Sequence, residues 1–402
     1  MENTKKITII GDVMCEPPLF EQVSAADGTY DFLPVFAPLK KLLSEADYVI
    51  ANLETPLAGE EAGYTATMVS FNTPDAIAET LKEIGVDMVS TANNHCTDRG
   101  MEGLVRTVKT LDRIGLAHTG TYADPAETDR IGYFTVGDTK LALLAYTTSN
   151  NGKVRLTEQD EKQVNMLRPS HGNKATKPKP KVLTDVQAFI EETFGRKPDW
   201  YETVKLTRAL GLKIAYADSA LEPEKWEKYL AHLDEEVKEA KKNADVVLFM
   251  PHTGGQFNVE PGCASQYFIY RAAQMGVDAI LAAHSHTTQK AEYYCGVPCF
   301  YSLGNVTMWP HSAYSERDTL PEYGLAAHLY TAGGKIVRTA YSIFKMDQDE
   351  GRPLRVVPVD ELYNELTDDA EKAQLEAEVA SIVARVGGSE PEDKTIQREY
   401  VL

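Results

Sequence analysis

Gly85-Val-Asp-Met-Val-Ser-Thr-Ala-Asn-Asn-His95 is the stretch of this chain that decides the fold. Its centre, Met88–Thr91, is a short predicted strand that begins with apolar Met88 and Val89, and two amides and an imidazole follow shortly after it. Apolar residues at helical spacing precede the strand over Pro74–Gly85 and follow it as far as Ile114. Strands that alternate with helices in this way predict βαβ units and a largely parallel sheet.

The same alternation continues on both sides of this stretch. Toward the N-terminus, Ile7–Ile10 and Tyr48–Ala51 are predicted strands, with a predicted helix at Pro34–Leu43 between them. Toward the C-terminus the predicted strands are Leu141–Tyr146, Val246–Met250, Ala279–Ala283 and Cys299–Leu303, the predicted helices are Trp226–Asn243 and Ser265–Gly276, and a predicted hairpin joins Ala326–Tyr330 to Ile336–Tyr341.

Two segments lie outside the alternation. Residues from about 150 to 225 are polar and irregular, and residues 174–181 form a basic run broken by prolines. We read this region as an insertion that covers one end of the sheet. The tail from Asp360 is acidic and helical. We therefore expect an α/β domain over residues 1–345, with the insertion inside it, and an acidic, helical C-terminal extension over residues 346–402.

Composition excludes several classes of partner. The chain has 402 residues and a formal net charge of -19, which argues against non-specific binding of nucleic acid and against an anionic membrane surface. A small anionic substrate remains compatible, because a bound metal ion inverts the local field. We see no apolar segment of membrane-spanning length and no export signal before the first strand, so we expect a cytoplasmic protein with no membrane span.

The five cysteines are odd in number and scattered along the chain. Without an export signal we expect free thiols in a reducing compartment. Cys295 and Cys299 could instead pair, or could form half of a zinc site, but no second cysteine pair exists to complete such a site.

Residues with metal-ligand chemistry each follow a predicted strand. They are Asp12, Glu54, Asn94, His252, His284 and His286. In a parallel sheet the carboxyl ends of the strands converge on one edge, where ligands bind. Two carboxylates, an amide and three imidazoles suit Mn²⁺, Fe²⁺ or Zn²⁺. Two such ions would clamp an oxyanion and generate a hydroxide nucleophile near neutral pH.

Each motif taken alone also has a purely structural explanation. Asp12 after Gly11 could start a turn, Glu54 before a Thr-Pro pair could belong to one, and His252 could be an ordinary loop histidine. The two imidazoles of His284-x-His286 have the most metal-like spacing. Histidines without such a setting are read as solvated or core residues; they are His118, His171, His232, His311 and His328.

As an ordered set, however, the motifs closely resemble the CapA family of poly-gamma-glutamate capsule proteins, a branch of the calcineurin-like metallophosphoesterases. The matching pieces cover roughly residues 5 to 310; they lie at residues 10–14, 51–56, 85–95, 245–252, 276–278, 283–286 and 301–305. The resemblance implies a four-layer αββα sandwich with a cleft for one or two divalent ions (Mn, Fe or Zn).

The resemblance also implies a division of the ligands between two positions. Asp12 and His286 would bind the first metal and Glu54 would bridge both metals. The second metal would be bound by Asn94, His252 and His284.

Two further pairs of residues receive roles by the same resemblance. His95 would be the general acid that protonates the leaving group, with Asp98 or a backbone carbonyl fixing its tautomer. Gln256 and Asn305 would contact substrate.

The chain departs from the pattern at three points. Met14 stands where the wider superfamily has a histidine, which weakens the first metal position and is common in this branch. Gln256 stands where a glutamate is usual, and Ala283 replaces a glycine. The retained ligands favour a metal-dependent hydrolase of a phosphoester or of a gamma-glutamyl amide, acting on an anionic small molecule or gamma-glutamyl polymer. The departures favour the alternative, a non-catalytic accessory protein of capsule synthesis that uses the cleft only to bind.

Overall fold

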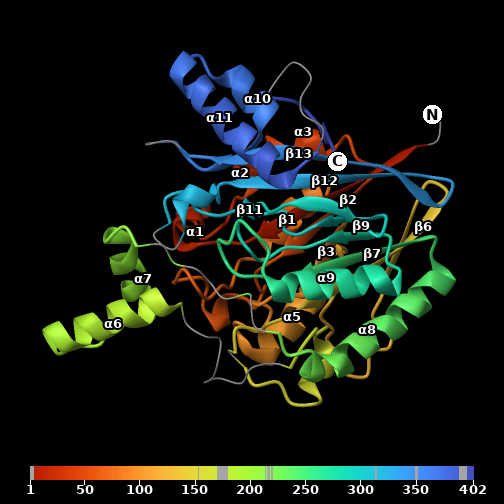
Figure 1. Cartoon of the computed structure of the whole chain (residues 1–402), viewed down its shortest axis with the longest axis horizontal. Helices are drawn as coiled ribbons and strands as arrows, with labels where there is room; N and C mark the ends of the chain where they lie inside the picture. The colour runs from red at the N-terminus through yellow and green to blue at the C-terminus, as the bar shows by residue number, and fades with distance from the viewer. Residues whose placement is uncertain are drawn as a thin grey trace.

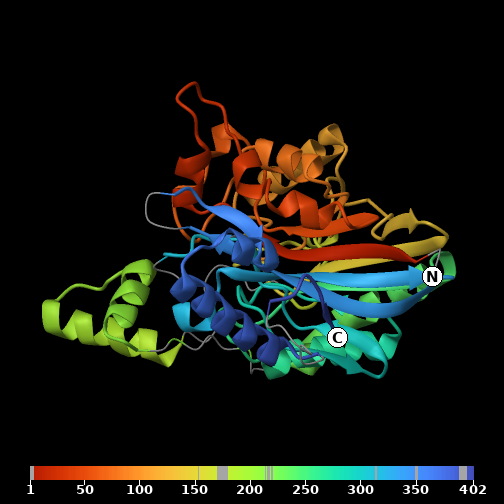
Figure 2. The same cartoon turned by 90° about the horizontal axis from the view of Figure 1, so that it is seen from above.

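Two β-sheets lie face to face with helices on both outer sides, as Figures 1 and 2 show. This computed structural model describes residues 4–152, 154–169, 180–212, 214, 218, 221–312, 315–348, 352–388 and 396–402. The four layers are helices, sheet, sheet and helices, which confirms the predicted αββα sandwich.

The first sheet combines a parallel half with an antiparallel half. Its main strand order is β14-β13-β12-β1-β2-β3-β4, with β11 beside β1 and β15 beside β13. Strands β1 to β4 run parallel, whereas β12 pairs antiparallel with β1 and with β13. The bounds are β1 Lys5–Val13, β2 Tyr48–Leu53, β3 Met88–Ser90, β4 Ala117–Thr119, β11 Asn305–Thr307, β12 Tyr323–Ala332, β13 Lys335–Asp347, β14 Arg355–Pro358 and β15 Tyr400–Val401.

The second sheet has the strand order β5-β6-β7-β8-β10-β9. Its four central strands run parallel, and β5 and β9 pair antiparallel at the two edges. The bounds are β5 Gly132–Val136, β6 Thr139–Thr147, β7 Val246–His252, β8 Ala279–Leu281, β9 Ala291–Tyr294 and β10 Val297–Phe300.

The central strands are apolar on both faces because each sheet is covered on both sides. In β1, Ile7 and Ile9 pack between the sheets, and Ile10 faces the outer helices. In β7, Leu248 packs between the sheets and Phe249 packs against the helices of the second sheet. This alternation makes the strands nearly continuous apolar runs, and the runs end where polar residues begin.

Helices α1 to α5 cover the first sheet, and α8 and α9 cover the second (Figure 2). In α8 the apolar stripe that includes Trp226, Leu230 and Val237 is fully buried, as its helical spacing predicts. The bounds are α1 Pro17–Val23, α2 Leu33–Phe36, α3 Leu39–Leu43, α4 Ala76–Glu83, α5 Gly100–Ile114, α8 Pro223–Asn243 and α9 Cys263–Met275, with short 3-10 helices at η1 Glu60–Ala62, η2 Asp160–Gln163 and η3 Arg317–Thr319.

Two expectations from the sequence need correction. The helix predicted over Pro34–Leu43 is broken into α2 and α3 at Pro38, which has no backbone N–H to continue the helical ladder. The region predicted to be irregular contains two helices, α6 Lys181–Phe194 and α7 Trp200–Ala209, which form an arm that extends away from the body in Figures 1 and 2. Most of the basic run at residues 174–181 lies outside the described residues.

The C-terminal segment joins the same core. Strands β14 and β15 both pair with β13, and the helices are α10 Val359–Glu365 and α11 Asp369–Val386. The stripe of α11 that includes Leu375, Val379 and Ile382 is buried with residues of both sheets. The helical character of the tail agrees with the sequence, and the division at residue 345 stays a prediction.

Candidate metal centre

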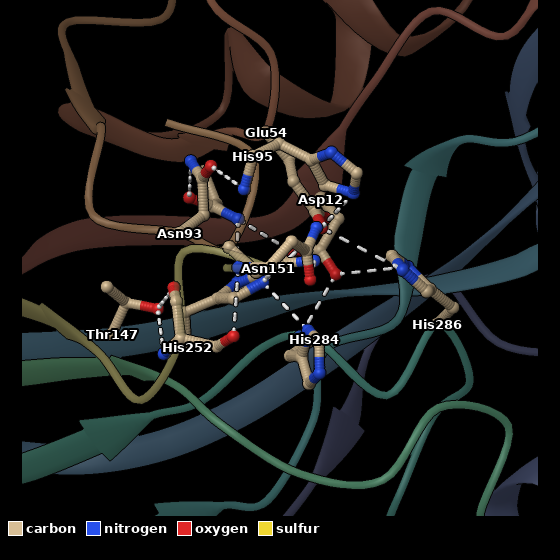
Figure 3. A network of polar contacts seen from close by, with 12 residues as sticks. Asp12, Glu54, Asn93, His95, Thr147, Asn151, His252, His284 and His286 are labelled. Carbon is tan, nitrogen blue, oxygen red and sulfur yellow. Dashed lines mark hydrogen bonds and ion pairs between the residues drawn. The ribbon is translucent and has the colours of Figure 1, made fainter. Parts of the chain in front are cut away.

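The six predicted ligands come together where the parallel strands of both sheets end. Figure 3 shows Asp12, Glu54, His252, His284 and His286 converging on one place. Asp12 belongs to β1, Glu54 follows β2, and His252 ends β7. Asn94 and His95 lie in the loop after β3, and the two remaining histidines lie in the loop after β8. All six predicted ligands are buried.

Asp12 is fixed in orientation by backbone and side-chain donors. Gly11 beside it has no side chain because a Cβ there would lie 2.0 Å from the carbonyl oxygen of Gly304. Asn52 Nδ2 donates to Asp12 Oδ1 over 2.7 Å, and the backbone N–H of His284 donates to Oδ2 over 3.1 Å. Burial, reinforced by the neighbouring Glu54, raises the pKa of Asp12 to about 6 in the metal-free protein.

Glu54 is the least satisfied acidic group of the cleft. Its side chain is fully buried, and neither carboxylate oxygen has a hydrogen-bond partner among the described residues. Burial raises its pKa. Unpartnered buried carboxylates are costly, so they occur where an ion or a functional role accounts for them. Its Oε1 lies 3.3 Å from His252 Nε2 and 3.8 Å from His286 Nε2, which places Glu54 between two groups of ligands.

The second position is compact. His252 Nε2 lies 2.6 Å from Asn94 Oδ1, 3.0 Å from His284 Nδ1 and 3.3 Å from Glu54 Oε1. Ligand atoms bound about 2.1 Å from one ion at angles near 90–109° lie about 3.0–3.4 Å apart. The distances from His252 Nε2 to the other three atoms are therefore close to those between ligands of a single divalent ion. Glu54, His252 and His284 form one of the two acid–histidine groups able to hold a metal in the described part of the chain.

The first position is looser. It consists of Asp12, Glu54 and His286, the other such group. His286 Nε2 lies 3.8 Å from Glu54 Oε1, and no imidazole comes from position 14. Met14 instead bonds through its backbone to Thr307: its N–H donates to Oγ1 over 3.0 Å and its carbonyl accepts from Oγ1 over 2.7 Å. The first position thus offers fewer and more widely spaced ligands than the second.

The loop that carries the last two histidines has an unusual backbone. His284 has φ 104° and His286 has φ 54°, in a region that residues with a Cβ rarely adopt. Non-glycine residues in this region cluster at functional sites, where surrounding contacts hold the strain. Asn305 is one such contact, because its Nδ2 donates to the carbonyl of His286 over 3.0 Å and to that of Pro321 over 2.9 Å.

The orientation of Asn305 also fixes the tautomer of His286. With Nδ2 occupied, Asn305 Oδ1 faces His286 Nδ1 at 2.9 Å and accepts its proton. His286 Nε2 then carries the lone pair and is the atom turned to Glu54, as a metal ligand requires. Asn305 is fully buried, and its predicted contact with substrate stays a prediction.

His95 stands at the edge of the ligand cluster rather than within it. Its Nδ1 lies 2.6 Å from Asp98 Oδ2, and its Nε2 lies 3.9 Å from Glu54 Oε1. Asp98 Oδ2 also accepts the backbone N–H of Phe71, whose ring packs 4.4 Å from the imidazole. Asp98, rather than a backbone carbonyl, therefore sets the tautomer and leaves Nε2 directed into the cleft.

Gln256 lies in the loop that follows β7. It is half-buried and precedes Phe257, whose ring centroid is 5.9 Å from that of His286 and whose N–H donates to the carbonyl of Ser285 over 2.6 Å. The loop thus borders the cleft on the side of the first position. A direct role of Gln256 in binding substrate stays a prediction.

Three further asparagines lie in the cleft; the sequence marked Asn93 as part of a motif without giving it a role, and it did not mark Asn52 or Asn151 individually. Asn52 contacts both Asp12 and His252, and Asn93 Nδ2 donates to the carbonyl of Leu53 over 2.8 Å. Asn151, in the loop after β6, accepts from Asn94 Nδ2 over 3.2 Å. The signal was available in part, because both Asn52 and Asn151 lie where an apolar run ends.

A family model described as "Bacterial capsule synthesis protein PGA_cap" matches residues 6–308. The chain belongs to this family. The finding confirms the CapA-type resemblance drawn from the motifs. The match ends soon after β11, so β12 to β15 and helices α10 and α11 lie beyond the part of this family member that the model covers.

Two of the curated relatives carry capsule-related names. "Capsule biosynthesis protein CapA" of Bacillus anthracis is 23% identical over 381 residues, which are 93% of this chain and 76% of that protein. "PGA biosynthesis protein CapA" of Bacillus subtilis (strain 168) is 23% identical over 305 residues, 74% of this chain and 62% of that protein. Protein y4sH of Sinorhizobium fredii (strain NBRC 101917 / NGR234) is 27% identical over 295 residues, 68% of this chain and 61% of that protein. The chain thus spans less than two thirds of the last two relatives.

Solved structures show a weaker likeness. A hypothetical protein from Thermus thermophilus has a TM-score of 0.44 at 17% identity, and the match covers 85% of this chain and 99% of that one. Similarity at this level says nothing about function.

Two expectations about the whole chain can be compared with the structure. No helix in the described residues is long and apolar enough to cross a bilayer. All five cysteines fall within the described residues and are free, so Cys295 and Cys299 are not joined. No cysteine belongs to a metal-type group in that part of the chain.

Proposed function

We propose that this PGA_cap family member is a metal-dependent hydrolase whose cleft would hold two divalent ions, with Glu54 common to the two groups of ligands. The observation that carries the proposal is the carboxylate of Glu54, which is fully buried, has no hydrogen-bond partner among the described residues, and lies between two sets of ligand atoms. The nearest cationic groups are the imidazoles of His95, His252 and His286, at 3.3–3.9 Å from Oε1, and a buried charged acceptor without a hydrogen bond costs stability. Two bound cations would offset that cost.

The donor set fits borderline divalent ions. Asp12, Glu54 and His286 would hold one ion, and Glu54, Asn94, His252 and His284 the other, a mixture of carboxylate, amide and imidazole that suits Mn²⁺, Fe²⁺ or Zn²⁺. Bound ions in such a pair supply Lewis acidity and a nucleophile at neutral pH. The looser first position, which lacks an imidazole at Met14, should bind its ion more weakly.

The residues of this chain then orient the substrate and move a proton. The ligand side chains are buried, so their positions are fixed by protein contacts rather than by bulk solvent. His95, held by Asp98 through Nδ1, presents Nε2 beside Glu54 and gives its proton to the leaving oxygen or nitrogen. The short Asp98 contact stabilises the protonated imidazole before transfer and fixes its direction.

The substrate class follows from chemistry and family together. A pair of cations in an otherwise acidic protein selects anionic groups at the cleft. The names of the family and of the two Bacillus relatives concern capsule and PGA biosynthesis. We therefore propose a phosphoester or a gamma-glutamyl amide of capsule-related material as the substrate.

One observation favours a second function. The first position has lost a ligand at Met14, and Gln256 replaces a carboxylate expected by resemblance. A cleft that retained only the compact second position could bind a capsule polymer without cleaving it.

Turnover distinguishes the two functions. Metal-stripped full-length protein would be reloaded with Mn²⁺ and incubated with a phosphomonoester, a phosphodiester and a gamma-glutamyl peptide, and product release would be followed over time. The hydrolase proposal predicts metal-dependent turnover of at least one substrate class. Binding of the same compounds without any product, at full metal occupancy, would overturn the hydrolase and support the binding protein.

A further inference from the structure

Arg385 of α11 reaches the loop that carries His286. Its Nη1 lies 2.7 Å from the carbonyl oxygen of Thr319, 3.0 Å from Thr287 Oγ1, and 3.3 Å from both the carbonyl oxygen and Oγ1 of Thr288. Thr287 directly follows the metal-type residue His286, and both threonines are fully buried. Arg385 belongs to the C-terminal segment beyond the matched family region.

The loop between β8 and β9 is paired with other strands only at its ends. Single bridges join Ala283 to His252 and Thr288 to Leu303, and between them the backbone departs from extended geometry at His284 and His286. Thr287 uses its own carbonyl to accept from Ser285 Oγ over 2.8 Å, and its hydroxyl donates to Thr319 over 2.6 Å. The Arg385 guanidinium binds the carbonyl oxygen and Oγ1 of Thr288 in this loop. It also binds the carbonyl oxygen of Thr319 in the neighbouring 3-10 helix η3. One cation thus joins two loops at the edge of the first metal position.

Helix α11, which carries Arg385, is itself held in place by the core. Its stripe including Leu375, Val379 and Ile382 is buried in the core that both sheets share. Glu378 accepts the hydroxyl of Tyr323 in β12 and pairs with Lys345 of β13 at 2.8 Å. The helix is therefore fixed to the same sheet that presents Asp12.

The partners of Arg385 are unusual for a half-buried cation. Its hydrogen-bond acceptors among the described residues are all neutral oxygens of the two loops, and the carboxylate whose charge acts on it is Glu260. By contrast Arg398, in the same C-terminal segment, pairs with Glu45, Asp360 and Glu361 far from the cleft. Guanidinium groups keep their charge and hold several acceptors in a fixed geometry, which suits Arg385 to fixing a loop.

We infer that Arg385 is a positioning residue of the metal centre: by holding Thr287 and Thr288 it sets the place of His286, so the C-terminal segment completes the first metal position. This inference rests on the proposed two-ion cleft. Groups that orient a metal ligand from outside the coordination sphere typically contribute about 10–100-fold to metal affinity. Loss of Arg385 should weaken the first position by roughly that factor and the second position much less. His286 directly precedes Thr287, whereas His284 lies three residues before it and Asn94 and His252 belong to other segments of the chain.

The test is a calorimetric titration of Mn²⁺ into metal-stripped full-length protein. The variants are Arg385→Ala, Arg385→Lys and the matched control Arg398→Ala, each with its melting temperature measured. The inference predicts two binding events in the wild type, selective weakening of the weaker one in Arg385→Ala, partial recovery in Arg385→Lys, and unchanged affinities in Arg398→Ala despite some loss of stability. Amide hydrogen exchange of residues 285–289 adds a readout without metal, with protection lost only in the two Arg385 variants.

The outcomes separate this inference from the proposed hydrolase. Wild-type protein that binds two Mn²⁺ ions without hydrolysing any substrate would refute the hydrolase and leave the inference to be judged by the affinities. Unchanged first-position affinity in Arg385→Ala would overturn the inference, as would equal weakening of both positions together with the same stability loss as Arg398→Ala. If the wild type binds no metal, unaltered exchange at residues 285–289 overturns it, and selective loss of protection supports the loop-holding role.

Discussion

Glu54→Gln is expected to shift the stability of the metal-free and the metal-loaded protein in opposite directions. Without metal, the wild type buries a carboxylate that has no hydrogen-bond partner among the described residues. An unsatisfied buried acceptor costs about 1–3 kcal/mol, and more when it is charged. A neutral amide of the same shape relieves part of this cost, so the metal-free variant should gain about 1–2 kcal/mol. Because burial raises the pKa of Glu54, the comparison belongs at pH 8, where the carboxyl group is more fully ionised.

With bound metal, the wild type should become more stable than Glu54→Gln. At a free ion concentration about 100 times the dissociation constant, each site adds about 2.7 kcal/mol to the wild type, and two sites add roughly 5 kcal/mol. The unfolding entropy of about 2.1 cal/mol/K per residue makes 1 kcal/mol worth roughly 1 °C in a chain of 402 residues. The wild-type melting temperature should therefore rise by about 6 °C with Mn²⁺, whereas Glu54→Gln, having lost the bridging charge, should rise by much less.

Differential scanning calorimetry with and without Mn²⁺ measures both expected changes in melting temperature. Glu236→Gln is the matched control: Glu236 is a buried glutamate of α8 that accepts from Tyr146 and lies 3.4 Å from Arg130 Nε. That variant should lose stability equally with and without metal. A Glu54→Gln protein that keeps the full metal-dependent rise, or that melts well below the wild type without metal, would refute the reasoning and make Glu54 an ordinary structural residue.

Three further predictions concern single groups. His95→Ala should keep metal content and fold but lower turnover by about 10²–10⁴-fold, less on substrates with good leaving groups; unchanged kcat would contradict the general-acid role. His252→Ala should abolish the tighter Mn²⁺ binding event in calorimetry, and His286→Ala should remove the weaker one, whereas the reverse order would contradict the assignment of positions. Burial raises the pKa of Glu16 to about 7, above its unfolded value, so the folded state holds this proton more tightly and stability falls as pH rises between about 4.5 and 7. The fall is about 3 kcal/mol, and urea unfolding of Glu16→Gln from about pH 4.5 to 8 should show a correspondingly flatter dependence if this group causes it.

The sequence predicted the residues of the candidate site better than it predicted the arrangement of the strands in two sheets. Asp12, Glu54 and His252 each end an apolar run, and the convergence of parallel strand ends brings them together in the folded chain. The division into two sheets has no such local signal, because strands buried on both faces read alike whichever sheet they enter. Only the resemblance to a family indicated the sandwich.

The contacts that the sequence did not indicate join residues far apart in the chain. Asn52 reads locally as part of a turn, and its contact with His252 spans 200 residues. Arg385 and Thr288 are 97 residues apart, and nothing in the helical pattern of α11 marks this arginine as different from its neighbours. The helices of the insertion were missed for another reason, because many charged residues surround the short apolar stripe of Leu183 and Ile190.

The most direct test of the metal centre is a crystal structure of protein soaked with Mn²⁺, with anomalous differences recorded near the manganese edge. The account predicts two peaks about 3.5–4 Å apart on either side of Glu54, the stronger one beside Asn94, His252 and His284 and the weaker one beside Asp12 and His286. A map without a peak within coordination distance of Glu54, in crystals whose protein is otherwise intact, would contradict the account.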